Sequence, residues 1–231
     1  MADWLTADEW LAVALSVKVS LWATVISLPF GIWIGWLLAR RRFIGQTALN
    51  AAVHLPLILP PVVTGYLLLL AFGRHGPAGR VLESFGVILA FRWTGAVLAA
   101  AVMAFPLMVR AIRLSFEAVD ARLEQAASTL GASPVMVFLT VTLPLILPGI
   151  IAGSVLAFAK AMGEFGATIT FVANIPGQTQ TMPTAIFALL QVPDGDAQAF
   201  RLVLISIGIA VAAVVGAELM ARAVSRRIGG G

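Results

Sequence analysis

The chain has 231 residues, of which 60% are hydrophobic and only 11% are charged, and its mean hydropathy is +0.99. Soluble domains carry roughly 45–50% apolar and about 25% charged residues, so this composition excludes an ordinary soluble fold. The chain lacks cysteine and has two histidines, which excludes disulfides and thiolate metal sites, and we expect no metal site of any kind. The net charge of +4 requires no nucleic-acid partner, because basic residues beside membrane spans set topology.

About five apolar runs are long enough to cross a bilayer, which takes about 20 mostly apolar residues per helix. They cover residues 11–39, 55–72, 94–110, 143–162 and 202–221, and we assign residues 1–231 to one all-α integral membrane domain. The first run is too long for a signal peptide and no basic segment precedes it, so we expect it to remain as a span. Pro56, Pro60 and Pro61 stand at the start of the second run and, with Gly65, predict a kinked or irregular helix.

The arginines beside the spans predict the orientation, because cytoplasmic loops carry an excess of basic residues. With the N-terminus outside, nine arginines fall on the inner side and four on the outer side. The inner set is Arg40, Arg41, Arg42, Arg110, Arg113, Arg122, Arg222, Arg226 and Arg227, and the outer set is Arg74, Arg80, Arg92 and Arg201. We therefore expect an inner-membrane, multi-pass protein with a periplasmic N-terminus and a cytoplasmic C-terminus.

Residues 163–200 contain two apolar pieces, each too short to span, on either side of the sequence Asn-Ile-Pro-Gly at 174–177. One interpretation is a re-entrant or interfacial structure, which is tolerated at membrane depth only when it packs in protein or lines a cavity. The alternative is an ordinary outer loop that lies on the surface.

The cytoplasmic stretch 117–142 is too polar to span the membrane. Its pattern predicts a short helix, a break at Gly131, and a second helix with Pro134 in its first turn. Leu123, Ala127 and Leu130 share one face of the first helix. A helix-turn-helix between two spans, with small alanine side chains that permit close approach, suits the docking of a soluble partner.

This stretch resembles the EAA loop of ABC importer permeases, in which Glu-Ala-Ala is followed by a glycine and later by Ile-x-Leu-Pro at fixed spacing. The residues at those spacings here are Gln125, Ala126, Ala127, Gly131, Val141, Leu143 and Pro144. Gln125 replaces the glutamate, although Glu124 stands one residue earlier, and Val141 replaces isoleucine. The resemblance implies a type I ABC importer permease fold in which this loop, Glu124 included, forms coupling helices that enter a cleft of the nucleotide-binding subunit.

Segments 54–66, 105–113 and 163–171 extend the resemblance to the permease subunits of molybdate importers, although Gly-Glu-Phe-Gly at 163–166 also resembles sulfate permeases. The resemblance implies a lipid-embedded homodimer, two ATPase subunits that use ATP, a periplasmic oxyanion-binding protein, and no cofactor on this chain. The sequence contains no phosphate-binding Gly-x-x-x-x-Gly-Lys-Ser/Thr loop. The alternatives are a sulfate, thiosulfate or tungstate permease and, in another class, an intramembrane enzyme, for which the usual catalytic patterns are absent from the sequence.

Several polar residues within or beside the spans are candidates for the transport path or gate: Lys18, Lys160, Glu164, Ser16, Ser20 and Thr24. Ionisable groups at membrane depth are functional candidates by default. Lys18 and Lys160 either form a positive outer mouth that attracts an oxyanion or snorkel to the interface. Glu164 is either a gate, pairing or helix-terminus residue or a water-facing acid. The hydroxyl stripe, which continues to Ser27, either packs helices together or lines the path.

Overall fold

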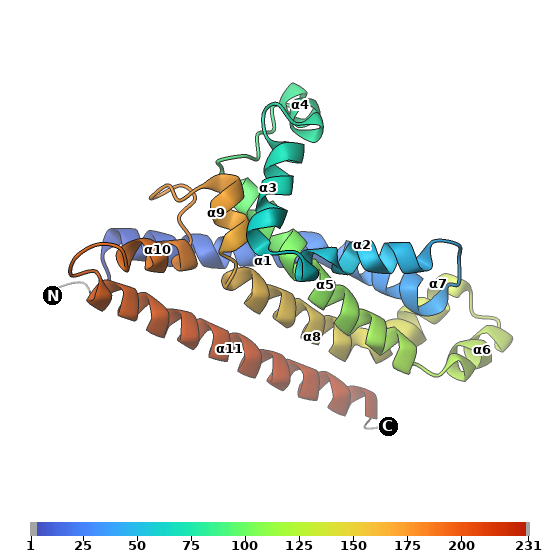
Figure 1. Ribbon diagram of the computed structural model, residues 1–231. Coiled ribbons are helices and arrows are strands. Elements are labelled where there is room, and N and C mark those ends of the chain that lie inside the picture. Colours follow the sequence, from blue (N-terminus) through green and yellow to red (C-terminus); the bar gives the residue numbers. More distant parts are fainter. Residues whose placement is uncertain (1–3, 230–231) are drawn as a thin grey trace.

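The computed structural model describes the backbone of residues 4–229 and the side chains of residues 4–220. Within this part of the chain all regular elements are helical, and no strand is present (Figure 1). Four helices are long and apolar enough to cross a membrane, and there are five if one sharply bent pair counts as a single span. The expected all-α membrane architecture with about five spans is therefore confirmed.

The described helices have these bounds in chain order: α1 (Ala7–Arg40), α2 (Gln46–Ile58), α3 (Pro61–Phe72), α4 (Pro77–Ser84), α5 (Trp93–Ala118), α6 (Ala121–Thr129), α7 (Pro134–Val137), the π-helical turn η1 (Phe138–Thr142), α8 (Leu143–Met162), α9 (Gly166–Val172), α10 (Met182–Leu189) and α11 (Asp196–Gly229). Arg222, Arg226 and Arg227, which contribute to the orientation argument, lie in the part of α11 whose side chains the structure does not describe.

Helices α1, α5 and α8 pack together and form the centre of the molecule. Small side chains line α5 at this contact, and the core is filled by larger ones such as Met108, Ile112 and Phe116. Gly31 and Gly35 of α1 lie directly against Met108 and Ile112. Without a hydrophobic driving force between helices in lipid, close van der Waals packing at small residues supplies much of the association energy.

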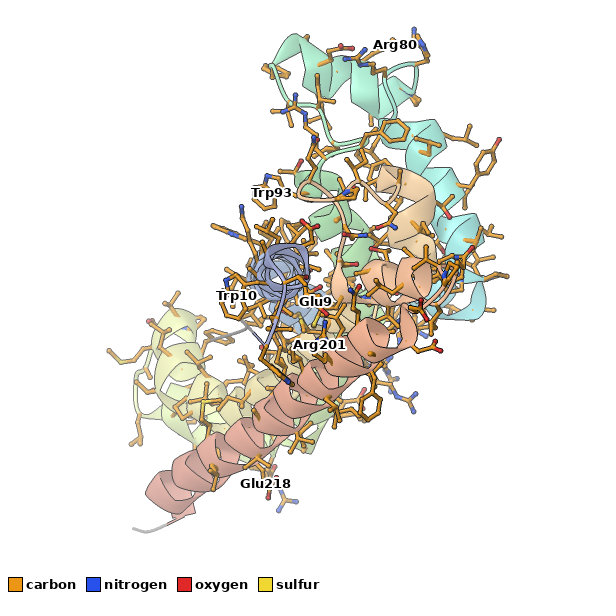
Figure 2. All side chains as sticks on the ribbon, turned by 90° about the vertical axis from the view of Figure 1, so that its left-hand side faces the viewer. Glu9, Trp10, Arg80, Trp93, Arg201 and Glu218 are labelled. Carbon is orange, nitrogen blue, oxygen red and sulfur yellow. The ribbon has the colours of Figure 1, made fainter. Side chains whose placement is uncertain are left out.

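The beginning of α1 is fastened to the beginning of α11. Thr6 and Glu9 form a capping box, in which the Thr6 N–H donates to the Glu9 carboxylate over 2.6 Å. The same carboxylate accepts from the guanidinium of Arg201 over 2.8 Å, and Figure 2 shows both residues where α11 passes the end-on α1. The ion pair thus connects the first and last long helices.

The second expected span, 55–72, is irregular as its prolines predict, but its helix begins earlier than expected. The helix begins at Gln46, ends at Ile58, and meets α3 at an angle of 114°. Leu59 and Pro60 are extended, with ψ angles of 143° and 134°. Two consecutive prolines explain the break, because each disfavours a helical residue before it and lacks the N–H that would continue the ladder.

Other boundaries also differ from the sequence-based expectations. Helix α5 continues to Ala118, well past residue 110, so the segment 117–142 begins in the last turn of α5. Its last turn carries the Arg113–Glu117 ion pair at 2.7 Å, an i,i+4 contact that stabilises the helix. The expected second helix of that segment is continuous with α8 through η1. The connector 73–94 contains α4, and α11 extends beyond 202–221 at both ends.

Residues 163–200 form the short helices α9 and α10 on either side of an irregular connector. Helix α9 packs against α3 and α5, and α10 packs against α1 and α11. Phe171 and Met182 are fully buried. Of the two alternatives, this packing favours the one in which the segment is covered by protein, rather than a loop on the surface.

We expect Gly65→Ala to lower the thermal midpoint of the purified protein. A β-carbon at Gly65 would lie 2.6 Å from the Ala167 carbonyl oxygen, so α3 and α9 would have to separate. Such overpacking costs about 1–3 kcal/mol. The matched control is Gly208→Ala in α11, where no atom within 4 Å would meet the new β-carbon. Equal midpoints for the two variants would show that the α3–α9 contact does not need its glycine.

Candidate functional site

The segment 117–142 folds as the sequence predicts at its centre. Helix α6 begins at the Asp120 cap, whose carboxylate accepts from the Arg122 N–H over 2.9 Å. The chain then turns at Gly131, which has a φ of +89°, a conformation that favours glycine. Ser133 caps the next helix by accepting from the Met136 N–H over 3.3 Å, and Pro134 follows in the first turn. The predicted order of helix, break and helix is confirmed.

The helix-turn-helix exposes several large apolar side chains. No residue of α6 is buried. Leu130 is 89% exposed and Val135 is 69% exposed, and Leu123 is about half exposed beside them. Gln125 and Ala126 are also exposed. The segment projects from one end of the helix bundle, at the right in Figure 1, and exposed large apolar side chains gathered in one segment suit an interaction surface.

Glu124 anchors α6 to two other elements. Its Oε1 accepts a hydrogen bond from Thr142 Oγ1 over 2.7 Å and forms an ion pair with Arg40 Nη2 over 3.2 Å. Arg40 Nη2 also donates to the Val119 carbonyl over 3.3 Å. Arg40 is the last residue of α1, and Thr142 ends the π-helical turn that leads into α8. The Glu124 carboxylate therefore joins α6, α1 and the base of α8.

The motif-matching residues fall into two groups. Gln125, Ala126, Ala127 and Gly131 belong to the projecting part, whereas Val141, Leu143 and Pro144 are half-buried where the chain enters α8. Leu143 packs against the central core. The second group begins with Val141 inside the π-helical turn, and such turns occur frequently at functional sites. The motif thus extends from an exposed surface to the core of the bundle.

Glu164 is paired, not water-facing. It is only 3% exposed, and its carboxylate lies 2.7 Å from the Lys160 ammonium. It also accepts from the Ala167 N–H over 3.1 Å, at the start of α9. The pair therefore closes the turn between α8 and α9, and the charge of Lys160 is compensated within its own chain.

Lys18 lies apart from Lys160 and rests on an aromatic ring. Its ammonium is 3.7 Å from the centroid of Trp93, the first residue of α5, in a cation–π contact. Lys18 is exposed and makes no ion pair with any described side chain. The two lysines therefore do not share one environment.

The hydroxyl stripe of α1 is buried between helices. Ser16 Oγ accepts from the Met182 N–H over 2.7 Å and so caps the first turn of α10. Thr24 donates to the Ser20 carbonyl over 2.8 Å. The buried Ser20 Oγ has no hydrogen-bond partner among the described residues. These contacts favour helix packing over a role in lining the transport path. The described side chains also contain no group of three or more potential metal ligands.

Comparison with known proteins agrees with this architecture. Residues 27–229 match the family of binding-protein-dependent transport system inner membrane components. The chain belongs to this family. It is 58% identical over 226 residues to the molybdenum transport system permease protein ModB of Escherichia coli K12. The matched residues cover 97% of this chain and 99% of that protein. The corresponding protein of Haemophilus influenzae is 51% identical over 221 residues, with 95% and 96% of the two chains covered.

Solved structures show the same fold. A bacterial ABC transporter that imports the acidic polysaccharide alginate superposes with a TM-score of 0.72 at 18% identity, covering 96% of this chain and 85% of that chain. An inward-facing methionine ABC transporter gives a TM-score of 0.69 at 18% identity, with 97% and 99% covered. The type I ABC importer permease fold expected from the sequence is confirmed.

Several residues that matter in this family member were not singled out from its sequence. Arg40 counted only toward orientation, and Thr142 was an unremarked position between motif residues. The displaced glutamate was the available signal: Glu124 stands one residue before the motif position, and its carboxylate turns inward to Arg40. No contact between Trp93 and Lys18 was predicted, yet Trp93 holds Lys18.

We expect Glu124→Ala to loosen α6. The change leaves Arg40 and Thr142 without their shared partner, and a hydrogen bond to a charged group contributes about 1.5–3 kcal/mol. Even a loss of one or two kcal/mol changes an equilibrium by about 5–30-fold, so the amides of residues 121–129 should exchange with solvent faster by this factor. Glu117→Ala is the control, because it removes the same charge from an exposed pair. Equal exchange in both variants would contradict the anchoring role.

Proposed function

We propose that this chain is the permease subunit of an ATP-driven molybdate importer in the inner membrane. The single observation that supports molybdate as the substrate is the similarity to molybdenum permeases over nearly the whole of both chains. Fold alone would not choose a substrate, because one fold hosts many functions. Residues throughout the helix bundle, and not only the coupling motif, contribute to that similarity.

The proposed assembly is a homodimer of this chain with two ATPase subunits and a periplasmic oxyanion-binding protein. ATP hydrolysis belongs to the ATPase subunits, and this chain binds no cofactor. The exposed apolar surface around Leu130 and Val135 supports the docking of a soluble subunit, since burial of such side chains contributes about 25 cal/mol per Å². The end of the molecule that carries α6 and α7 would face the cytoplasm, and the N-terminus of α1 the periplasm.

The anchoring of α6 suggests how ATPase closure reaches the membrane. A force applied to α6 acts through the Glu124 carboxylate on Arg40 at the end of α1 and on Thr142 at the base of α8. Because α1 and α8 both pack on α5, displacement of α6 would move the long helices together. Alternating access then consists of a rigid-body shift of this bundle against its copy.

The proposal predicts that molybdate, delivered by the binding protein, stimulates ATP hydrolysis by the reconstituted transporter more than sulfate does. The chain alone should neither hydrolyse ATP nor accumulate oxyanion, because its sequence carries no phosphate-binding loop. The measurement is ATPase rate and oxyanion uptake in proteoliposomes, with and without each subunit.

If sulfate stimulated ATP hydrolysis more strongly than molybdate, the proposed substrate would change to sulfate, and the assignment as an importer permease would stand. ATP hydrolysis by the purified single chain would contradict the permease assignment itself.

A further inference from the structure

A broad cavity of about 1380 Å³ opens where α1, the end of α3 and the beginning of α5 meet. Its wall carries Lys18, Arg74, His75 and Arg92, and none of its lining residues is an aspartate or glutamate. The cavity therefore holds three formal positive charges, one from each of the lysine and the two arginines, with no acidic side chain to balance them. Such a concentration of one sign in a concave surface draws ions of the opposite sign.

Lys18, Arg74 and Arg92 form no ion pair with any described side chain. The ion pairs among the described side chains are Arg40–Glu124, Arg113–Glu117, Lys160–Glu164 and Arg201–Glu9. Glu83 of α4 belongs to the same connector as two of the cations, but it does not line the cavity. The positive charge of the wall is thus available to a ligand.

The beginning of α5 adds a second source of positive potential. Arg92 is the cap of this helix of 26 residues, and Trp93 and Thr94, its first helical residues, line the cavity. The first turn contains no acidic residue, and no side chain caps it. The exposed N–H groups and aligned peptide dipoles of a helix N-terminus are equivalent to about half a positive charge and favour anions.

The Lys18–Trp93 contact holds the lysine at this wall. An ammonium that snorkels would reach for the interface, but here it lies 3.7 Å from the ring centroid of a residue in the first turn of α5. Figure 2 shows Trp93 in the view between α1 and the segment that carries α4, with Arg80 farther out on α4. Lysine, indole and helix terminus are therefore brought together by α1 and α5.

We propose that this cavity is a low-affinity binding vestibule for divalent tetrahedral oxyanions. Three positive charges and a helix N-terminus suit a dianion, and the volume is several times that of one hydrated ion, so the anion keeps much of its water. Weak binding suits a vestibule, because a transported ion must leave as readily as it enters. The inference rests on the proposed function for its ligand, which it extends to a specific place on this chain.

The same oxyanion chemistry occurs in free molybdate or sulfate and in the phosphate of an anionic lipid headgroup. The chain contains no cysteine, so Gln178→Cys would place a single thiol on the cavity wall. In nanodiscs of neutral lipid, we expect a sulfonate-bearing methanethiosulfonate reagent to modify this thiol at least about 10-fold faster than its quaternary-ammonium counterpart. The preference should fall strongly between low salt and about 1 M salt, where screening acts over about 3 Å. Millimolar molybdate or sulfate should slow the modification.

A triple variant combines Lys18→Gln, Arg74→Gln and Arg92→Gln with the reporter thiol. It should lose both the preference for the sulfonate reagent and the protection by oxyanion. Arg80→Gln is the matched control, because Arg80 is exposed on the same connector but does not line the cavity. Arg74→Gln alone, which removes one charge from an exposed side chain, should reduce the preference. This single variant provides the test if the triple variant does not fold.

Three results would overturn the proposal. One is equal modification by both reagents at low salt. Another is protection by anionic phosphatidylglycerol but not by free oxyanion, which would identify a lipid site. The third is protection by the periplasmic binding protein with none by free molybdate or sulfate, which would identify a protein contact and no anion site. None of these readouts requires transport, so a failed vestibule is distinguishable from a failed importer assignment, which the ATPase measurement tests.

Discussion

The interior of a bilayer offers no hydrogen-bond partners, so each interruption of a helix at membrane depth must be covered by protein. Two interruptions in this chain, at Leu59–Pro60 and at Gly163–Phe165, cover one another, because α3 packs on α9. Gly65 of α3 lies against Ala167, and Gly166 at the start of α9 lies against Pro61. Beside each break, a glycine without a side chain allows the backbone next to the other break to approach closely. The pair between Lys160 and the buried Glu164 closes the second break.

The end of the molecule that carries α6 and α7 depends on a different interaction. There the Glu124 carboxylate connects a helix with no buried residue to the ends of two long helices. An exposed helix anchored at one charged residue can accept a partner on its outer face without losing its inner connection. This division explains why the motif residues separate into an exposed group near Gly131 and a half-buried group near Leu143. Under the proposed function, docking and transmission would belong to different parts of the same segment.

Much of the fold followed from the sequence, because long apolar runs, prolines and glycines act locally. The C-terminal end of α1, both ends of α8 and the turn at Gly131 were predicted from such signals. What could not be predicted depends on contacts between distant segments. Nothing local to Arg40 indicates that it meets Glu124, and nothing local to Lys18 indicates that it rests on Trp93. The prolines of the second span predicted its irregular geometry, but its start at Gln46 was missed, because the first residues of α2 include polar side chains.

The central claim is that the surface around Leu130 receives the ATPase subunit. Because the chain has no cysteine, Leu130→Cys places a single thiol on that surface, and a maleimide-linked benzophenone attached there captures its nearest neighbour on irradiation. Trp10→Cys, an exposed position near the other end of α1, is the control. In the assembled transporter, the account predicts that the ATPase subunit is captured from position 130 and not from position 10. Capture of the ATPase subunit from position 10, or none from position 130, would contradict it.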